Sequence, residues 1–307
     1  MKKKTKVVVL KGGFSDERNV SLLSGKTCAE QLRLKNHFVI ELDVKKSIVN
    51  DLKKLNPSVV FNCLHGTFGE DGTIQAILEW LEIPYTHSGV FSSSLAMNKH
   101  KTKEFISNYK LPVAKGSFLS KDLILKSDLL AKPFVIKPNK QGSSLGVEIF
   151  KEVENRENFL KKVFSRDLDK QNFIIEEFIP GRELTTVVVN KKSIGVTEII
   201  VDDWYDYEAK YIKGKSKHEF PAKIPKKIEN LCKSFAEKTH NLIGCRGITR
   251  TDFRWDPSKG TDGLIILEIN TQPGMTSTSL VPEQVKKSGS NLSTLCEWIL
   301  EDASCLR

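Results

Sequence analysis

The hydrophobic and polar positions in the first third of the chain follow two alternating patterns. Short apolar runs at 6–10, 37–43 and 58–64 have the length of buried strands, and stretches with helical spacing occur at 19–32 and 73–82. Strands that alternate with helices are typical of a doubly wound α/β domain, which is built on a parallel sheet. The pattern therefore predicts an N-terminal domain of this class that ends near residue 96.

The remainder of the chain also contains strand-like and helical segments. The pattern predicts helices at 97–109, 153–165, 225–242 and 292–300, and strands at 134–137, 173–177, 184–189 and 193–200. Residues 202–218 are polar and aromatic and lack a regular period. Loops of that length in compact domains are typically lids or disordered segments, and Lys210 and Tyr211 are its candidates for reaching a substrate.

Two short strands near the C-terminus flank the turn-forming sequence WDPSKGTDG, which predicts a hairpin with a long loop. Side chains alternate across a strand, so Arg250 and Asp252 share one face of the first strand. By the same rule Glu268 and Asn270 share one face of the second. The four polar groups are expected to converge, and the apolar run 264–267 predicts that the second strand is buried on both faces up to Glu268.

The converging groups predict a site for a metal ion and phosphates. Carboxylate and amide oxygens suit Mg²⁺, which proteins typically hold with one or two carboxylates together with substrate phosphates. A neighbouring arginine, Arg250, suits an anionic transition state. The alternative is that Arg250 and Asp252 only form a salt bridge within a sheet. The Glu-x-Asn ending and the glycine-containing turn TQPGMT after it favour the metal and phosphate site.

Glycine-rich loops follow two of the predicted N-terminal strands. The first contains Gly12, Gly13 and Glu17, and the second runs from His65 to Gly72. Open α/β sheets bind ligands beyond the carboxyl ends of their strands, so His65 is a candidate binding residue. The alternative is that the imidazole only holds the turn through a hydrogen bond to the backbone.

Two features in the middle of the chain suit a nucleotide. Lys137 lies inside an apolar strand, where a lysine needs a counter-anion, and a Gly/Ser loop at 139–147 follows it. Amides and hydroxyls in such a loop can cover phosphates, although the loop would serve equally well as a linker. The segment 178–183 is an apolar hinge with Glu176 and Glu183 at its edges. Its free backbone groups suit a flat heterocycle, but an ordinary interdomain hinge would have the same composition.

Composition narrows the class of protein. The formal net charge is +10, but the lysines are dispersed and no nucleic-acid-binding motif is present, so we expect no nucleic-acid partner. No apolar run approaches the roughly 18 residues that a membrane span requires. The apolar VVVL run is too short for a signal peptide, and the six cysteines lack C-x-x-C spacing. A cytoplasmic protein with reduced thiols is the expectation.

Eight motifs, taken in order, resemble the ATP-grasp superfamily and, within it, the D-alanine:D-alanine ligase family over nearly the whole chain. They are GGFSDE (12–17), HGTFGEDG (65–72), MNK (97–99), VIKPNKQGSSLGV (135–147), EEFIPGRE (176–183), YDYEAKY (205–211), GITRTDF (247–253) and LEINTQPGMTSTSLVP (267–282). Leu145 stands where valine is common, and Gln272 where serine is common. The resemblance implies an α/β fold, α+β in its ATP-grasp part, with domains at 1–96, 97–182 and 183–307.

The resemblance also implies roles for individual residues in joining two D-alanine molecules at the expense of ATP. Lys99 and Lys137 would hold the α and β phosphates, and Lys210 the γ phosphate. The hinge backbone at Glu177 and Ile179 would take adenine, with Glu176 on its amino group and Glu183 on the ribose. Two Mg²⁺ or Mn²⁺ ions would be bound by Asp252, Glu268 and Asn270. The first D-alanine would be held at Glu17 and His65, the second at Ser279 and Leu280, and the oxyanion would be stabilised by Arg250 and the Gly274 backbone. A hydrogen-bonded triad of Glu17, Ser143 and Tyr211 would lock the lid.

Further expectations come from the family and leave alternatives open. The resemblance implies a homodimer, and K⁺ is a candidate monovalent ion. One alternative function is a ligase of the same fold with D-lactate as acceptor, which Tyr211 disfavours because the resembling D-lactate enzymes usually have phenylalanine there. Another is a catalytically silent ATP-binding protein, which the complete set of polar site residues disfavours.

Overall fold

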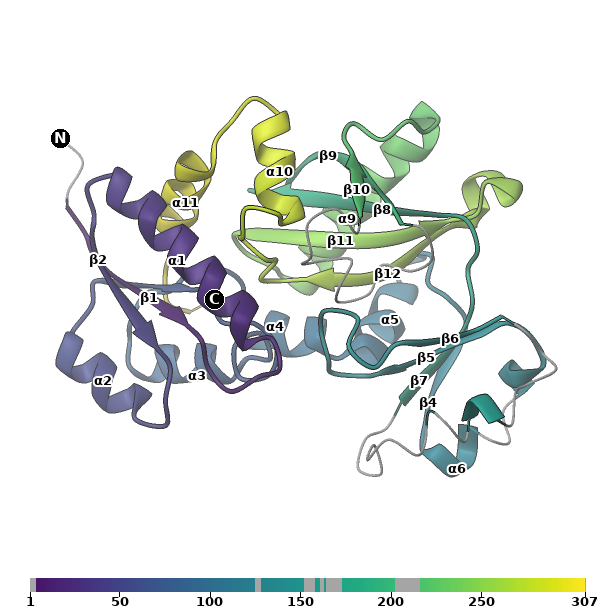
Figure 1. Ribbon diagram of the computed structural model, residues 1–307, viewed down its shortest axis with the longest axis horizontal. Coiled ribbons are helices and arrows are strands. Elements are labelled where there is room, and N and C mark those ends of the chain that lie inside the picture. The colour runs from purple at the N-terminus through teal and green to yellow at the C-terminus, as the bar shows by residue number, and fades with distance from the viewer. Residues whose placement is uncertain are drawn as a thin grey trace.

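The computed structural model describes residues 4–124, 128–151, 158–160, 163, 173–201 and 216–306. Their strands form three sheets, which Figure 1 shows as separate layers. The first sheet is parallel, in the order β2-β1-β3, from β1 (Lys6–Lys11), β2 (Phe38–Asp43) and β3 (Val59–Asn62). Its helices are α1 (Arg18–Leu34), α2 (Ile48–Leu55) and α3 (Thr73–Trp80). These bounds confirm the predicted alternation of strands and helices in the N-terminal part.

The second sheet is antiparallel and small. Its order is β4-β7-β5-β6, from β4 (Gly116–Leu119), β5 (Phe134–Pro138), β6 (Glu148–Phe150) and β7 (Phe173–Glu177). The helix α5 (Lys99–Ser107) precedes it, and the short helices α6 (Lys121–Ile124) and η1 (Asp128–Ala131) lie between its strands in sequence. Phe134, Phe150 and Phe173 belong to its buried core, so the sheet has an apolar cluster of its own.

The third sheet has the order β10-β9-β8-β11-β12 and is also antiparallel. Its strands are β8 (Arg182–Val189), β9 (Lys192–Ile200), β10 (Lys217–Glu219), β11 (Ile248–Trp255) and β12 (Leu264–Asn270), with helix α9 (Lys226–Ile243) packed against it. The 3-10 helix η3 (Pro257–Gly263) forms the turn between β11 and β12. The predicted hairpin is thus confirmed.

The C-terminal helices α10 (Leu280–Lys287) and α11 (Leu292–Glu301) return to the first sheet. Cys296 and Ile299 of α11 share one buried cluster with Val7 and Phe61 of that sheet. Figure 1 shows α11 beside the purple α1, and α10 next to α11, where it contacts β9 of the third sheet. The two ends of the chain therefore pack together, and the division into domains at 96 and 182 stays a prediction.

The sequence-based prediction gave no range for several of the described helices. Among them are α10 and α4 (Val90–Met97), a serine-rich segment at the predicted end of the first domain. Serine is a weak helix former because its hydroxyl competes for backbone hydrogen bonds. Here tertiary partners use those hydroxyls, since Ser92 Oγ donates to the carbonyls of Ile243 (2.8 Å) and Gly244 (2.9 Å).

The burial of β12 also differs from the prediction. Ile265 and Leu267 are only half-buried, so the strand alternates and is not covered on both faces. The predicted helix at 153–165 and the long loop at 202–218 lie mostly outside the described residues, and Lys210 and Tyr211 are among those not described. Within the described ranges, no helix is long and apolar enough to cross a membrane.

Candidate active site

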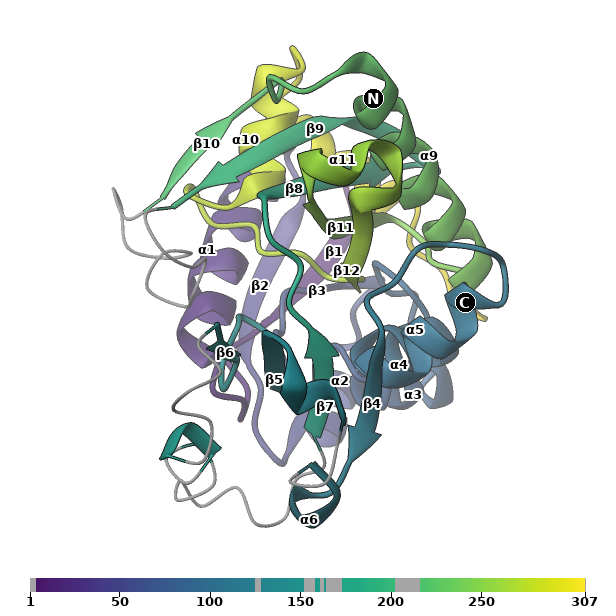
Figure 2. The ribbon, with the colours of Figure 1, turned by 90° about the vertical axis from the view of Figure 1, so that its right-hand side faces the viewer.

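Two cavities adjoin the ends of β11 and β12, and together they contain every predicted site residue that the structure describes. The larger lies between the second and third sheets, which face each other in Figure 2, and its volume of about 780 Å³ includes space open to solvent. Lining residues include Lys99, Lys137, Glu176, Glu177, Ile179, Glu183, Asp252 and Glu268. The other, about 540 Å³ on the same measure, is lined by Glu17, His65, Ser143, Arg250, Asn270, Gly274, Ser279 and Leu280, among others.

The hairpin brings its four polar residues together as predicted. In the register of β11 and β12, Asp252 pairs with Glu268 and Arg250 with Asn270. Arg250 donates from Nε to Asp252 Oδ1 (2.8 Å) and from Nη2 to Oδ2 (2.7 Å), and Asn270 Nδ2 donates to Oδ2 (3.1 Å). The Arg250–Asp252 salt bridge therefore exists, but as one part of a larger polar cluster at a cavity wall.

The donor chemistry of this cluster fits a magnesium site that phosphates complete. Lys99 Nζ lies 3.2 Å from Glu268 Oε2, so Glu268 faces an ammonium and Asp252 a guanidinium. Among the described residues no group of three His, Cys, Asp or Glu side chains could hold an ion on its own. Two carboxylates and one amide oxygen suit Mg²⁺ only when substrate oxygens supply the remaining ligands.

Glu176 is buried between two lysines. Lys137 Nζ lies 2.8 Å from Glu176 Oε2, and Lys103 Nζ donates to Oε1. Burial alone would raise the pKa of Glu176, but the two ammonium groups lower it to about 2, so the side chain is a carboxylate. Burial, partly offset by Glu176, lowers the pKa of Lys103 to about 7. The carboxylate thus holds Lys137 at the wall of the larger cavity.

The hinge between β7 and β8 forms another wall of this cavity. The amides of Glu177 and Phe178 donate to the carbonyls of Lys115 (2.9 Å) and Pro133 (3.0 Å). Any backbone hydrogen bond of these two residues with a base would therefore fall to their carbonyl groups. Glu183 is buried beside the hinge, and Arg254 Nη1 lies 3.5 Å from its Oε2.

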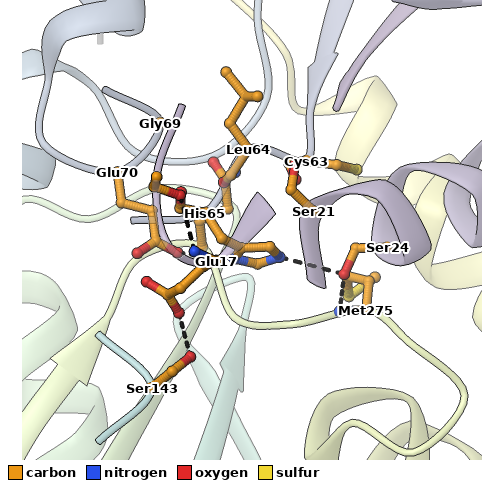
Figure 3. Close-up of polar contacts among 12 residues, drawn as sticks. Glu17, Ser21, Ser24, Cys63, Leu64, His65, Gly69, Glu70, Ser143 and Met275 are labelled. Carbon is orange, nitrogen blue, oxygen red and sulfur yellow. Dashed lines mark hydrogen bonds and ion pairs between the residues drawn. The ribbon is translucent and has the colours of Figure 1, made fainter. Parts of the chain in front are cut away.

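His65 is held on both ring nitrogens (Figure 3). Nδ1 lies 3.0 Å from Glu70 Oε1, and Nε2 lies 3.2 Å from Ser24 Oγ. Ser24 Oγ also accepts a hydrogen bond from the backbone amide of Met275. Burial alone would lower the pKa of His65, but Glu70 and then Glu17 outweigh it, and the net pKa is raised. A buried imidazole that favours its cationic form suits a carboxylate ligand, and its contacts go beyond the predicted alternative of holding a turn.

Ser143 Oγ donates to Glu17 Oε1 across the second cavity, as the dashed line in Figure 3 shows. Ser143 and Ser144 both have left-handed backbone angles, with φ of 51° and 58°. Non-glycine residues rarely adopt these angles, and such strain is concentrated at functional loops. Two members of the predicted triad are therefore in contact, and the third, Tyr211, lies outside the described residues.

The turn after β12 closes the second cavity. A Cβ atom at Gly274 would lie 2.9 Å from Ser279 Oγ, so the backbone there approaches the serine closely. Ser279 precedes α10, and Leu280 is the first residue of that helix. Gln272 connects this turn to the first sheet, because its Nε2 donates to the Leu64 carbonyl and its Oε1 accepts from Asn62 Nδ2 (2.8 Å). The departure at Gln272 thus has a structural role that the sequence did not predict.

Comparison with known proteins identifies the family. A family model described as "D-ala D-ala ligase C-terminus" matches residues 108–301, and one described as "D-ala D-ala ligase N-terminus" matches residues 45–88. D-alanine–D-alanine ligases of Ruegeria pomeroyi and Dinoroseobacter shibae are 48% and 47% identical to the chain over 302 residues. These matches cover 98% of this chain and 97% and 96% of the relatives. The chain belongs to the D-alanine–D-alanine ligase family.

Solved structures agree with this family. The D-alanine–D-alanine ligase from Bacillus anthracis complexed with ATP has a TM-score of 0.80 at 26% identity, over 97% of both chains. The VanG D-Ala:D-Ser ligase from Enterococcus faecalis also has a TM-score of 0.80 at 26% identity, over 97% of this chain and 99% of that one. The predicted ATP-grasp fold is confirmed by these likenesses.

Three residues escaped the sequence analysis: Glu70 and Arg254, which line the cavities, and Lys103, which contacts the lining residue Glu176. Lys103 is four residues after Lys99 and so lies on the same face of α5, but lysines on a helix are usually solvated. Arg254 follows Arg250 and Asp252 with the period of two that places alternate side chains on one face of a strand. Extending that period by one step would have found it. Glu70 lacked a signal besides its place in the loop after His65.

Proposed function

We propose that this chain joins two D-alanine molecules into D-alanyl-D-alanine, with ATP as co-substrate, for the synthesis of peptidoglycan precursors. The observation that carries the proposal is the junction of the two cavities at the ends of β11 and β12. A pocket lined by lysines adjoins a smaller cavity that contains a buried carboxylate, Glu17, and a histidine with a raised pKa, His65. The two cavities suit a polyphosphate and an amino acid zwitterion, respectively.

The larger cavity would hold the nucleotide. Lys99 and Lys137 would bind the α and β phosphates, and Lys210, outside the described residues, the γ phosphate. The hinge at Glu177 and Ile179 would take adenine, with Glu176 on its amino group and Glu183 on the ribose. The pairing of Glu176 with two lysines supports this arrangement. One lysine can neutralise the Glu176 carboxylate while the other binds phosphate.

Asp252, Glu268 and Asn270 would hold two Mg²⁺ or Mn²⁺ ions together with phosphate oxygens. Bound there, the ions would neutralise negative charge on the phosphates and orient them. The finer expectations from the family are part of this proposal: a K⁺ ion, a homodimer and a cytoplasmic location.

The chemistry follows from the placement of the chain's own groups. Glu17 would bind the ammonium of the first D-alanine, and His65 would lie near its carboxylate. That carboxylate would attack the γ phosphorus in line, form an acyl phosphate and release ADP as the bond to the bridging oxygen breaks. The neutral amine of the second D-alanine, held by Ser279 and Leu280, would then displace phosphate. Arg250 and the Gly274 amide would stabilise the tetrahedral oxyanion.

The lid would protect the intermediate from water. An acyl phosphate hydrolyses readily, so the site must be closed while it exists. The contact between Ser143 and Glu17 supports a closed position of the loop, and Tyr211 would complete this triad.

The likeness to a D-Ala:D-Ser ligase raises a second candidate for the acceptor. We therefore propose to test the purified protein with ATP, Mg²⁺ and D-alanine, with D-serine, D-lactate or L-alanine as competing acceptors. The proposal expects the D-alanine dipeptide to dominate and L-alanine to be inert. A dominant D-alanyl-D-serine or depsipeptide product would assign the chain another acceptor. ATP binding without any ligation would favour the alternative of a catalytically silent ATP-binding protein.

A further inference from the structure

Arg254 connects the end of β11 to the hinge through all three nitrogens of its guanidinium group. Nε donates to the carbonyl of Ile179 (3.2 Å), and Nη2 donates to the carbonyl of Gly181 (2.9 Å). Nη1 lies 3.5 Å from Glu183 Oε2. One rigid, forked side chain therefore contacts three alternate residues along the hinge, which a single ammonium group has no geometry to do.

The backbone of the same hinge packs on the same end of β11. Gly181 has φ of +95°, and a Cβ atom there would lie 2.2 Å from the carbonyl oxygen of Trp255. The Arg254 guanidinium also lies 5.9 Å from the centre of the Phe178 ring, within the range of a cation–π contact. The hinge is thus fixed to β11 by close backbone packing and by one arginine.

Three of the hinge residues that Arg254 contacts also face the larger cavity. Phe178, Ile179, Glu183 and Arg254 itself line it. Because Arg254 binds the carbonyls of Ile179 and Gly181, it sets the orientation of their peptide planes, and it orients the buried Glu183 carboxylate as well. A flat heterocycle is recognised by backbone and side-chain groups of this kind only when their positions are fixed in advance.

We propose that Arg254 is a positioning residue for the nucleoside, which fixes the hinge and Glu183 so that the cavity selects an adenine nucleotide over other bases. The inference deepens the proposed function, because it rests on ATP binding in this cavity. It assigns Arg254 no contact with the reacting atoms and none with D-alanine.

Arg254→Met and Arg254→Lys test the inference against Arg182→Met. Arg182 is a matched control because it lies at the same hinge and pairs with a buried carboxylate, Glu198, but does not line the cavity. Equilibrium affinities for ATP and GTP are measured by calorimetry without D-alanine, together with thermal midpoints and the KM for D-alanine.

We expect Arg254→Met to weaken ATP binding by about tenfold to a hundredfold, since it removes several charge-assisted hydrogen bonds. The preference for ATP over GTP should fall by about tenfold, and the KM for D-alanine should stay within about twofold. Arg254→Lys should recover part of the affinity, and it provides the answer if the methionine variant fails to fold. Arg182→Met should leave affinity and preference within about twofold of wild type.

The inference is overturned if both Arg254 variants that fold keep the wild-type ATP affinity and preference. It is also overturned if Arg182→Met loses the same affinity as Arg254→Met for the same loss of thermal stability, because the role would then be structural. Failure of the wild-type protein to bind ATP is a different result, since it would refute the proposed function itself.

Discussion

Lys99 Nζ lies 3.2 Å from Glu268 Oε2, so a lysine from the start of α5 meets a carboxylate from the end of β12. The same ammonium donates to the carbonyl of Gln141 in the Gly/Ser loop (2.7 Å). This lysine therefore contacts the lid loop and the polar cluster of the hairpin at once. Under the proposed function Lys99 would bind phosphate and Glu268 a metal ion, so each would exchange its present partner for ligand atoms, and changes at either residue should affect turnover.

Glu268→Gln should lower kcat by about a hundredfold or more while ATP affinity changes far less, because the change removes one of the two negative charges that the proposed Mg²⁺ site contains. Raising Mg²⁺ should restore part of the rate. Steady-state kinetics at several Mg²⁺ concentrations, with calorimetric ATP binding, checks this. Glu104→Gln, an exposed carboxylate paired with Lys101, is the control and should behave as wild type. Near wild-type turnover of Glu268→Gln at low Mg²⁺ would remove Glu268 from the metal site.

Lys103→Met should raise the KM for ATP by about tenfold to a hundredfold and leave the KM for D-alanine unchanged. Without Lys103, Glu176 keeps Lys137 as its cation and competes with phosphate for it. Lys101→Met, an exposed change on the same helix, should have little effect. An unchanged KM for ATP in a folded Lys103→Met protein would show that Lys137 binds phosphate without a second lysine to neutralise Glu176.

Ser143→Ala should uncouple ATP hydrolysis from ligation. Loss of the contact with Glu17 opens the lid, and water then captures the acyl phosphate. Phosphate and dipeptide are measured in the same reaction, and their ratio should rise from about one to severalfold more. Ser144→Ala changes the neighbouring residue of the same loop and should keep a ratio near one. A ratio near one in both variants would contradict the role of the contact.

Binding of the first D-alanine should weaken as pH rises through the raised pKa of His65. Glu70, Glu17, Arg250 and Ser24 face the imidazole, and the two carboxylates raise its pKa against the effect of burial. Because the pKa of His65 is raised in the folded protein, the cationic imidazole stabilises the fold at low pH, and this contribution is lost as pH rises through that pKa. The attraction of the cation for a bound carboxylate is lost over the same range.

His65→Gln should raise the KM for the first D-alanine at low pH by about tenfold or more and remove this pH dependence. The KM for each D-alanine is measured between pH 6 and 9. His37→Gln, which removes a buried histidine paired with Glu297 far from the cavities, should keep the wild-type profile. A pH dependence that survives in His65→Gln would assign it to another group.

Local patterns predicted the parts of this fold that local physics decides. Alternation along two strands and a turn-rich loop were sufficient to place Arg250, Asp252, Glu268 and Asn270 in one cluster. The burial of Lys137 in a strand likewise pointed to a buried anion, and the structure identifies that anion as Glu176.

The remaining features depend on contacts between residues far apart in sequence. Lys103 meets Glu176 across 73 positions, and Ser143 meets Glu17 across 126, so neither pairing has a local signal. The helix α4 forms although its serines disfavour a helix, because Ser92 finds partners at the end of α9. Tertiary packing overrides local propensity in such cases.

The most direct test of the proposed function follows oxygen from D-alanine to phosphate. The purified protein is incubated with ATP, Mg²⁺ and D-alanine whose carboxylate carries oxygen-18, and phosphate and dipeptide are analysed by mass spectrometry. If the carboxylate attacks the γ phosphorus and the amine then displaces phosphate, each dipeptide is accompanied by one phosphate that carries one labelled oxygen. ATP turnover without dipeptide, or dipeptide accompanied by unlabelled phosphate, would contradict this account.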